Sequence, residues 1–479
     1  MSSSQKLKKG LLWSVVEVLV KRGFDLIVTL VLANILFPEQ FGIIGMATVV
    51  TSFVLVLSDV GISSALIQKA KEDLNDSHLF TAFWAGIIWA IFLYAVVYFI
   101  LTPLVSVFYS QPILLKVIPI LSLPILISSF NNIQQAILKR ALDFKKIALV
   151  KNTATFVGGT GAIVMALNGF GIWALVFNVV FPFFVMLPLF FYATKWLPKF
   201  VWDTKSFKEI FSFGLYTLGT SIIINITTHI DYLIIGKLIS AAALGAYTFA
   251  FMLTNLIRAQ ITSMLNRVMF PFYSSIQSDL GAVTAHYLKI IKYYAIIIYP
   301  LMLGILLFSD TIIIDFFGQK WFDAIRPAKI LALSVLVTVL TNGYNLIFRS
   351  IGKPKLEMLI QLGVLVFFLI PAIYMGAHYN GIIGVSYGIL IASVFNFIVV
   401  SIALKYYLNI SIISILQTVS PVVLTFMIVF IFISMLIQWF VISKYILIAL
   451  TVLCVIALYS LFLKKEVSFL KAKLFNNKK

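Results

Sequence analysis

Long apolar segments, separated by short polar or Pro/Gly-containing stretches, run along almost the whole chain. A helix needs about 20 predominantly apolar residues to cross a bilayer. Read at this length, the pattern predicts about fourteen spans. They lie near residues 11–37, 41–67, 79–107, 113–138, 147–167, 170–194, 209–235, 243–271, 286–309, 324–348, 356–377, 381–404, 411–439 and 443–463. We therefore predict an all-α integral membrane protein.

The composition agrees with a membrane protein and excludes a soluble one. Hydrophobic residues make up 62% of the 479 residues and charged residues only 11%, which is more apolar surface than a soluble chain can bury. The formal net charge of +19 does not indicate a nucleic-acid partner, because most Lys and Arg residues lie in short loops between spans. This bias predicts that both termini are cytoplasmic. It places the loops at 69–77, 139–146, 195–208 and 349–355 on the same side.

Three pairs of similar segments indicate an internal repeat. The pairs are PEQFGIIGM (38–46) with AAALGAYTF (241–249), LKRALDFKK (138–146) with FRSIGKPKL (348–356), and NGFGIWALV (168–176) with NGIIGVSYG (380–388). Their offsets lie between about 203 and 212 residues, as expected for parallel repeats of six spans. The repeat predicts an N-lobe at 1–194, a cytoplasmic lobe linker at 195–208, a C-lobe at 209–405, and a segment at 406–479 with spans 13 and 14 and a basic cytoplasmic tail.

The first predicted span carries more charge than a helix in a bilayer normally does. Glu17, Lys21 and Asp25 are spaced four apart, so they share one helix face and can pair in series. Arg22 lies about 100° around the helix from Lys21 and competes with it for Asp25. One interpretation is a self-neutralised contact between packed helices. The other, which we favour, is a basic site in a substrate cavity, since intramembrane charges usually face a protein interior or a wet cavity.

Further polar residues within the spans are candidates for the same cavity. Arg258 lies near the middle of span 8, with no acidic residue within one turn. Asn225 and His229 share a face of span 7, whereas Asp231 does not; His229 can instead be an ordinary hydrogen-bonded interior histidine. We predict ten cavity residues in all. They are Arg22, Arg258, Lys21, Asp25, Glu17, Asp59, Asn225, His229, Asp231 and Gln260.

Catalytic and metal-binding patterns are not recognisable in the sequence. The four histidines are scattered without metal-ligand spacing, and there is no Ser-His-Asp set or phosphate-binding glycine loop. The single cysteine, Cys454, excludes an internal disulfide. We expect a protein that is not an enzyme and that needs no cofactor or metal.

A set of short motifs resembles one transporter family. The motifs are GLLWSVV, LANILFPEQFGIIGM, SDVGISSALIQK, FYSQP, LKRALDFKK, GIWALV, FSFG, DYLIIGK, LGAYTFA and FGQKW. They resemble the Wzx-type flippases, the polysaccharide-transporter branch of the multidrug/oligosaccharidyl-lipid/polysaccharide exporter superfamily, and especially the colanic-acid and teichuronic-acid exporter-like subgroup. The likeness covers spans 1–12, while the last two spans match only in hydrophobicity.

The resemblance implies two six-helix lobes that form a V around a central cavity, with a C-terminal helix pair. It implies alternating access that moves an undecaprenyl-diphosphate-linked oligosaccharide outward across a bacterial inner membrane. It also implies polysaccharide polymerase and chain-length machinery as partners. A cation-coupled multidrug (MATE-like) exporter on the same fold is the main alternative, which would need unpaired cavity carboxylates. A membrane glycan enzyme is a third possibility, which would need a catalytic constellation.

Overall fold

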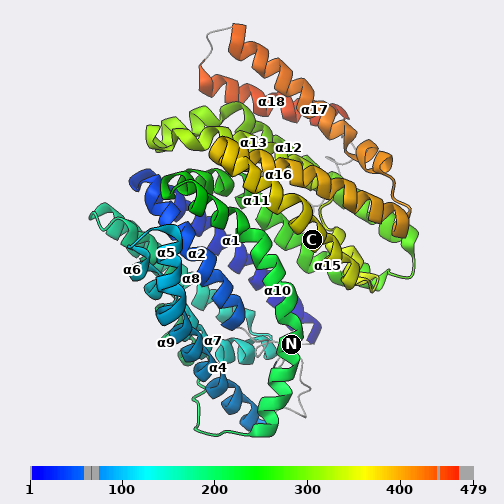
Figure 1. The fold of residues 1–479 in the computed structure, drawn as a ribbon. Helices are drawn as coiled ribbons and strands as arrows, with labels where there is room; N and C mark the ends of the chain where they lie inside the picture. The colour runs from blue at the N-terminus through cyan, green and yellow to red at the C-terminus, as the bar shows by residue number, and fades with distance from the viewer. Residues whose placement is uncertain (1–2, 59–65, 67–74, 440–442, 463–479) are drawn as a thin grey trace. The chain divides into compact units, whose positions relative to one another are not determined.

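The computed structural model describes residues 3–58, 66, 75–439 and 443–462, and among these residues all regular structure is helical (Figure 1). The contacts divide the chain into two compact units, Met1–Gly245 and Ala246–Lys479. Both units consist of long apolar helices that pack side by side, as expected where the backbone must satisfy its own hydrogen bonds in lipid.

The first unit contains the whole of the predicted N-lobe and extends beyond it to Gly245. Its helices are α1 (Ser3–Ile35), α2 (Pro38–Ser58), α4 (Asp76–Val96), the π-helix η1 (Val97–Leu101), α5 (Thr102–Tyr109), α6 (Leu114–Leu121), α7 (Leu123–Arg140), α8 (Phe144–Leu167), α9 (Ile172–Thr194) and α10 (Thr204–Leu238). Helix α8 packs against both α1 and α9, and α7 packs against α4 and α9. Helix α10 packs mainly against α2.

The second unit begins within α11 (Ala241–Ser275). It continues with α12 (Leu280–Phe317), the 3₁₀-helix η2 (Gln319–Ala324), α13 (Ile325–Val339), α14 (Tyr344–Ser350), α15 (Pro354–Val364), the π-helix η3 (Leu365–Leu369), α16 (Ile370–Leu408), α17 (Ile412–Trp439) and α18 (Lys444–Phe462). Helix α13 packs against α12 and α16. The terminal helices α17 and α18 pack against each other and against α12, where Leu303 and Phe308 meet Val429, Ile433 and Leu447.

Ten helical segments within the described part of the chain are long and apolar enough to cross a membrane. The chain is therefore a multi-pass membrane protein, and the prediction of an all-α membrane fold is confirmed. One of the ten, Pro354–Leu408, contains two predicted spans. It reverses direction at Asn380 and Gly381, where the backbone leaves helical geometry. The number of fourteen spans stays a prediction.

Backbone conformation supports the internal repeat independently of sequence similarity. Residues with positive φ recur in pairs: Ser110 with Gly318, Leu142 with Gly352, and Gly171 with Gly381. The pairs are separated by 208, 210 and 210 positions. Each pair lies in a turn at the end of a helix, where left-handed backbone is common. The predicted lobe boundaries stay a prediction. The compact units are defined by packing and the lobes by the repeat, and packing groups α10 with the first unit.

The predicted lobe linker, 195–208, is bound to α4. The indole Nε1 of Trp84 donates a hydrogen bond to the carbonyl oxygen of Lys199 (2.9 Å), and the backbone N–H of Asp203 donates to Oγ1 of Thr81 (2.9 Å). Helix α10 begins directly afterwards at Thr204, so the last part of the predicted loop is helical. These bonds fix the point from which α10 starts.

Candidate functional site

Two ion pairs join the charged residues of α1, and one of them reaches a second helix. Lys21 Nζ lies 2.8 Å from Asp25 Oδ2 within α1. Glu17 Oε1 lies 3.3 Å from Nζ of Lys151, which belongs to α8. The expected series of Glu17, Lys21 and Asp25 is therefore only partly formed. The physical reason is that one ammonium cannot fully neutralise two carboxylates. Asp25 keeps Lys21, and Glu17 is stabilised instead by Lys151 of the neighbouring helix.

These pairings leave Arg22 as a cation without a counter-charge in the described part of the chain. Its side chain is exposed, and among the described residues no group hydrogen-bonds or ion-pairs with its guanidinium. Val20 and Ile27, 51% and 55% exposed, lie roughly 150° around the helix from Arg22. Helix α1 therefore presents apolar side chains on one flank and charge on the other, which is the arrangement expected between lipid and a polar cavity.

The sequence did not identify Lys151 as a candidate. It lies near the start of a predicted span, where lysines commonly extend toward the interface, so the residue looked like part of a loop. Its partner Glu17 is the signal that could have found it, since a carboxylate in a span needs a cation from some neighbour. Small residues make the contact possible, because a Cβ on Gly159 of α8 would lie 2.6 Å from Val28 and 2.7 Å from the ring of Phe24.

Helix α10 carries three more predicted site residues. Asn225 and His229 are half-buried, and among the described residues nothing hydrogen-bonds to the buried Nδ1 of His229. The His229 ring meets Tyr232 edge-on at a centroid distance of 5.8 Å. Asp231 is only 5% exposed and accepts a hydrogen bond from the backbone N–H of Tyr232 (2.9 Å). Asp231 is thus turned into the packing, away from the Asn225 and His229 face.

In the second unit, Arg258 is held by uncharged groups. Its Nε donates to Oδ1 of Asn255 (2.7 Å), and its carbonyl oxygen accepts from the hydroxyl of Tyr294 on α12 (3.3 Å). No acidic residue in the described part of the chain pairs with it. Sequence reasoning missed Tyr294, which also shares a hydrogen bond with Thr262 (2.7 Å). Asp59 and the side chain of Gln260 lie outside the described residues.

The first turns of α2 and α11 meet backbone to backbone within the first unit. A Cβ on Gly42 would lie 1.7 Å from the carbonyl oxygen of Ala241, and one on Gly245 would lie 1.7 Å from that of Pro38. Gly42 and Gly245 occupy the same place in the repeat, as do Pro38 and Ala241. The contact is therefore reciprocal, as expected near a pseudo-two-fold axis.

A family model described as polysaccharide biosynthesis protein matches residues 31–326. The chain belongs to this family. Two curated proteins are similar to this chain over most of their length. The chain is 25% identical over 421 residues to teichuronic acid biosynthesis protein TuaB of Bacillus subtilis (strain 168), covering 87% of this chain and 86% of TuaB. It is 26% identical over 403 residues to lipopolysaccharide biosynthesis protein WzxC of Escherichia coli (strain K12), covering 83% and 80%.

Two solved structures share the fold of this chain. The lipid II flippase MurJ in an inward closed conformation has a TM-score of 0.75 at 16% identity, over 97% of this chain and 99% of MurJ. An inward-facing multidrug transporter of the MATE family has a TM-score of 0.65 at 16% identity, over 81% of this chain and 94% of that one. At these identities the likeness shows the fold alone.

Proposed function

We propose that this protein is a flippase that moves an undecaprenyl-diphosphate-linked oligosaccharide from the cytoplasmic to the outer leaflet of the bacterial inner membrane, for surface polysaccharide biosynthesis. Its two termini would face the cytoplasm, and polysaccharide polymerase and chain-length machinery would receive the product. The single observation that carries the proposal is Arg22, an exposed cation within the first predicted span whose neighbouring charges are already paired. Its family membership and its curated relatives agree with this role.

The chemistry of the substrate matches such a cation. A lipid diphosphate carries about two negative charges, and the planar guanidinium fork of arginine forms paired, charge-assisted hydrogen bonds with phosphate oxygens. Lys21 and Lys151 already hold Asp25 and Glu17, so Arg22, unlike Lys21, can take the diphosphate without first losing a partner among the described residues. No covalent step is required for this transport. The protein needs only a wet, basic path that opens to one side at a time.

Alternating access would use the two repeats as rocking bodies. The reciprocal contact of Gly42 with Ala241 and of Gly245 with Pro38 joins the first turns of equivalent helices. In the predicted orientation these turns lie on the outer side of the membrane. Closing that contact would seal the outer end, and separating it would open the path outward. Arg258, in the second repeat, would hold the diphosphate together with Arg22 during this movement.

The paired carboxylates argue against the cation-coupled drug exporter. Such a transporter would need a free cavity carboxylate, whereas Glu17 and Asp25 each have an ammonium within 3.3 Å and 2.8 Å. A substrate with a negative headgroup fits the remaining charge better than a cationic drug does.

Complementation of a flippase-deficient strain tests the proposal. Arg22→Ala should abolish export, and Arg22→Lys should retain part of it, because lysine keeps the charge and loses the fork. The same pair of substitutions at Arg258 should behave alike. Val20→Ala, on the opposite flank of α1, is the matched control and should export normally. Membrane abundance must be equal in all variants. Full export by Arg22→Ala at normal abundance would overturn the proposal.

A further inference from the structure

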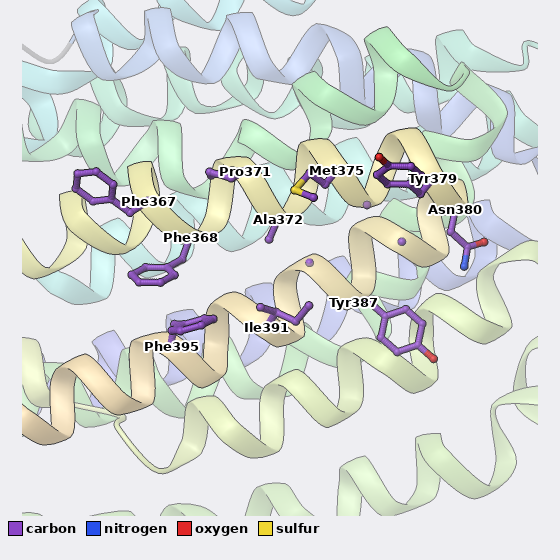
Figure 2. Close-up of a pocket in the computed structure, with 13 residues that line it drawn as sticks. Phe367, Phe368, Pro371, Ala372, Met375, Tyr379, Asn380, Tyr387, Ile391 and Phe395 are labelled. Carbon is purple, nitrogen blue, oxygen red and sulfur yellow. The ribbon is translucent and has the colours of Figure 1, made fainter.

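An apolar hollow of about 430 Å³ lies between the two limbs of the hairpin formed by η3 and the bent helix α16 (Figure 2). In Figure 2 the side chains of Phe368, Ile391 and Phe395, which come from both limbs, project into the space between them. Its lining is uncharged and largely aromatic or aliphatic. It includes Phe367, Phe368, Met375, Tyr387, Ile391 and Phe395.

Small residues bring the two limbs into contact beside this hollow. A Cβ on Gly376 would lie 2.2 Å from the carbonyl oxygen of Gly384, and one on Gly388 would lie 2.6 Å from that of Ala372. The two backbones therefore touch, as in other close contacts between membrane helices. Larger side chains on either side form the walls, and the rings of Phe368 and Phe395 stack at 4.2 Å across one end.

A second apolar hollow of about 250 Å³ continues the first along the same helix. Its lining includes Leu359, Gly363 and Val399, and it shares Phe367 and Phe368 with the first hollow. The two hollows lie in line along the helix from Leu359 to Asn380, with Phe367 and Phe368 between them, and we refer to them together as the trough. A helix of this length rises roughly 30 Å, which is about the thickness of the hydrocarbon core.

We propose that this trough, the α15–α16 trough, binds the polyprenyl chain of the carrier lipid while the sugar crosses the membrane. The inference rests on the proposed function and adds a site for the tail. The length of the trough favours a polyprenyl chain over a phospholipid acyl chain. A phospholipid acyl chain occupies one leaflet, about half of the core of about 30 Å, so it would fill only one hollow. An undecaprenyl chain is several times longer and can fill both.

The polar groups of the trough lie where such an occupant needs them. The amide of Asn380 and the hydroxyls of Tyr379 and Tyr387 are gathered at one end (Figure 2), and the rest of the lining is apolar. An isoprenoid chain has no polar groups along its length, so the apolar part suits the chain and the polar end suits the membrane surface. Tyr379 and Phe367 are 81% and 73% exposed, so a chain can enter sideways from the bilayer.

The terminal helices do not compete for this site. A cradle for the tail could have been expected on the appended pair α17 and α18, which has no partner in the repeat. In the second unit these helices pack chiefly against α12. The trough on α15 and α16 is lined by none of their residues. The tail site is therefore assigned to the eleventh and twelfth predicted spans.

Two glycines give a matched test. Gly363 lines the trough and Gly304 lies in α12 outside it, and neither would bring a Cβ within 4 Å of another residue. Gly363→Phe should fill the trough without distorting the fold, and Gly304→Phe is its control. Protein in vesicles of phosphatidylethanolamine and phosphatidylglycerol is photolabelled with a diazirine-bearing undecaprenyl phosphate or a diazirine-bearing phosphatidylglycerol, and the labelled peptides are identified.

The polyprenyl probe should label the α15–α16 peptide in the wild type and in Gly304→Phe. Labelling should fall about tenfold in Gly363→Phe, the loss expected when about two methylene groups leave their apolar contacts. Equal labelling of that peptide by the phospholipid probe, or no effect of Gly363→Phe, would overturn the tail site. Arg22→Ala separates the two proposals. Lost export with retained tail labelling supports both, whereas normal export with specific tail labelling overturns the proposed function and leaves the tail site supported.

Discussion

The hairpins α8–α9 and α15–α16 occupy equivalent places in the repeat, yet their glycines have different neighbours. In the first unit, a Cβ on Gly158 would lie 2.5 Å from Pro182, and one on Gly161 would lie 2.5 Å from the ring of Phe177. Side chains fill the space that these glycines leave. In the second unit, Gly376 and Gly384 meet each other's backbone, and Gly363 faces open space. Glycines thus support a packed hairpin in one unit and a hollow one in the other, at positions that the repeat does not make equivalent.

The packed hairpin explains where the charge of the first unit lies. Because Gly159 lets α1 approach α8 closely, Lys151 reaches Glu17. This pairing leaves Lys21 to Asp25 and leaves Arg22 with no partner among the described residues. The hollow hairpin has no comparable charge in its lining. The hairpin α8–α9 therefore helps to position a basic group, and the hairpin α15–α16 offers an apolar surface. An amphiphilic substrate has a charged headgroup for the first and an apolar chain for the second.

The largest effect is expected where a glycine of the first unit has backbone as its neighbour. In Gly42→Ala the added Cβ would lie 1.7 Å from the carbonyl oxygen of Ala241. Backbone cannot rotate away as a side chain can, and overpacking typically costs about 1–3 kcal/mol. We expect export to be lost because the outer end no longer closes.

Labelling from outside measures this closure. A cysteine at Asn225 in a Cys454→Ser background should react faster with an impermeant maleimide when Gly42→Ala is present. Gly304→Ala, with no neighbour within 4 Å, should change neither labelling nor export. Normal export and unchanged labelling in Gly42→Ala would show that the glycine contact has no role in closure.

Much of this organisation could be predicted from the sequence, because hydropathy and loop charge are local properties. The apolar pattern predicted the helices, and the segments around Leu142 and Gly352 predicted a repeat that the backbone supports. The partner of Glu17 could not be predicted, since it depends on how α1 packs against α8. The trough could not be predicted either, because it depends on the register between Gly376 and Gly384, which no helical periodicity reveals.

A smaller effect is expected at the ion pair between α1 and α8. Lys151→Met should reduce membrane abundance, because it leaves the carboxylate of Glu17, whose side chain is 14% exposed, without its cation. Removing one partner of a buried pair costs about 3–5 kcal/mol when burial is complete, and less here. The double variant Glu17→Gln with Lys151→Met should recover abundance, since no charge is left unpaired. Membrane abundance, measured by quantitative immunoblotting, and export are compared among wild type, the two single variants and the double variant. This double-mutant cycle gives the interaction between Glu17 and Lys151.

The same cycle distinguishes whether Glu17 and Lys151 only position α1 or also bind the substrate. Arg22 is untouched in the double variant, so export should return together with abundance. If abundance returns while export stays absent, Lys151 or Glu17 contacts the substrate, and the packed hairpin would then supply binding groups as well as support.

The smallest effect is expected at the start of α10, which the linker fixes to α4. The side chain of Asp203 accepts hydrogen bonds from the hydroxyl and the backbone N–H of Ser206, which hold the pKa of this carboxyl below its usual value. A lowered folded-state pKa means that Asp203 stabilises the fold above the unfolded-state pKa of about 3.9 and loses this contribution as the pH falls through the lower folded value.

Asp203→Asn keeps a capping oxygen but cannot titrate. The difference in melting temperature between wild type and Asp203→Asn should be constant from about pH 5 to 8 and shrink below about pH 4. A difference that varies between pH 5 and 8 would assign the titration to another group. The effect should be small, because the carboxylate is open to solvent and its hydrogen bonds compete with water.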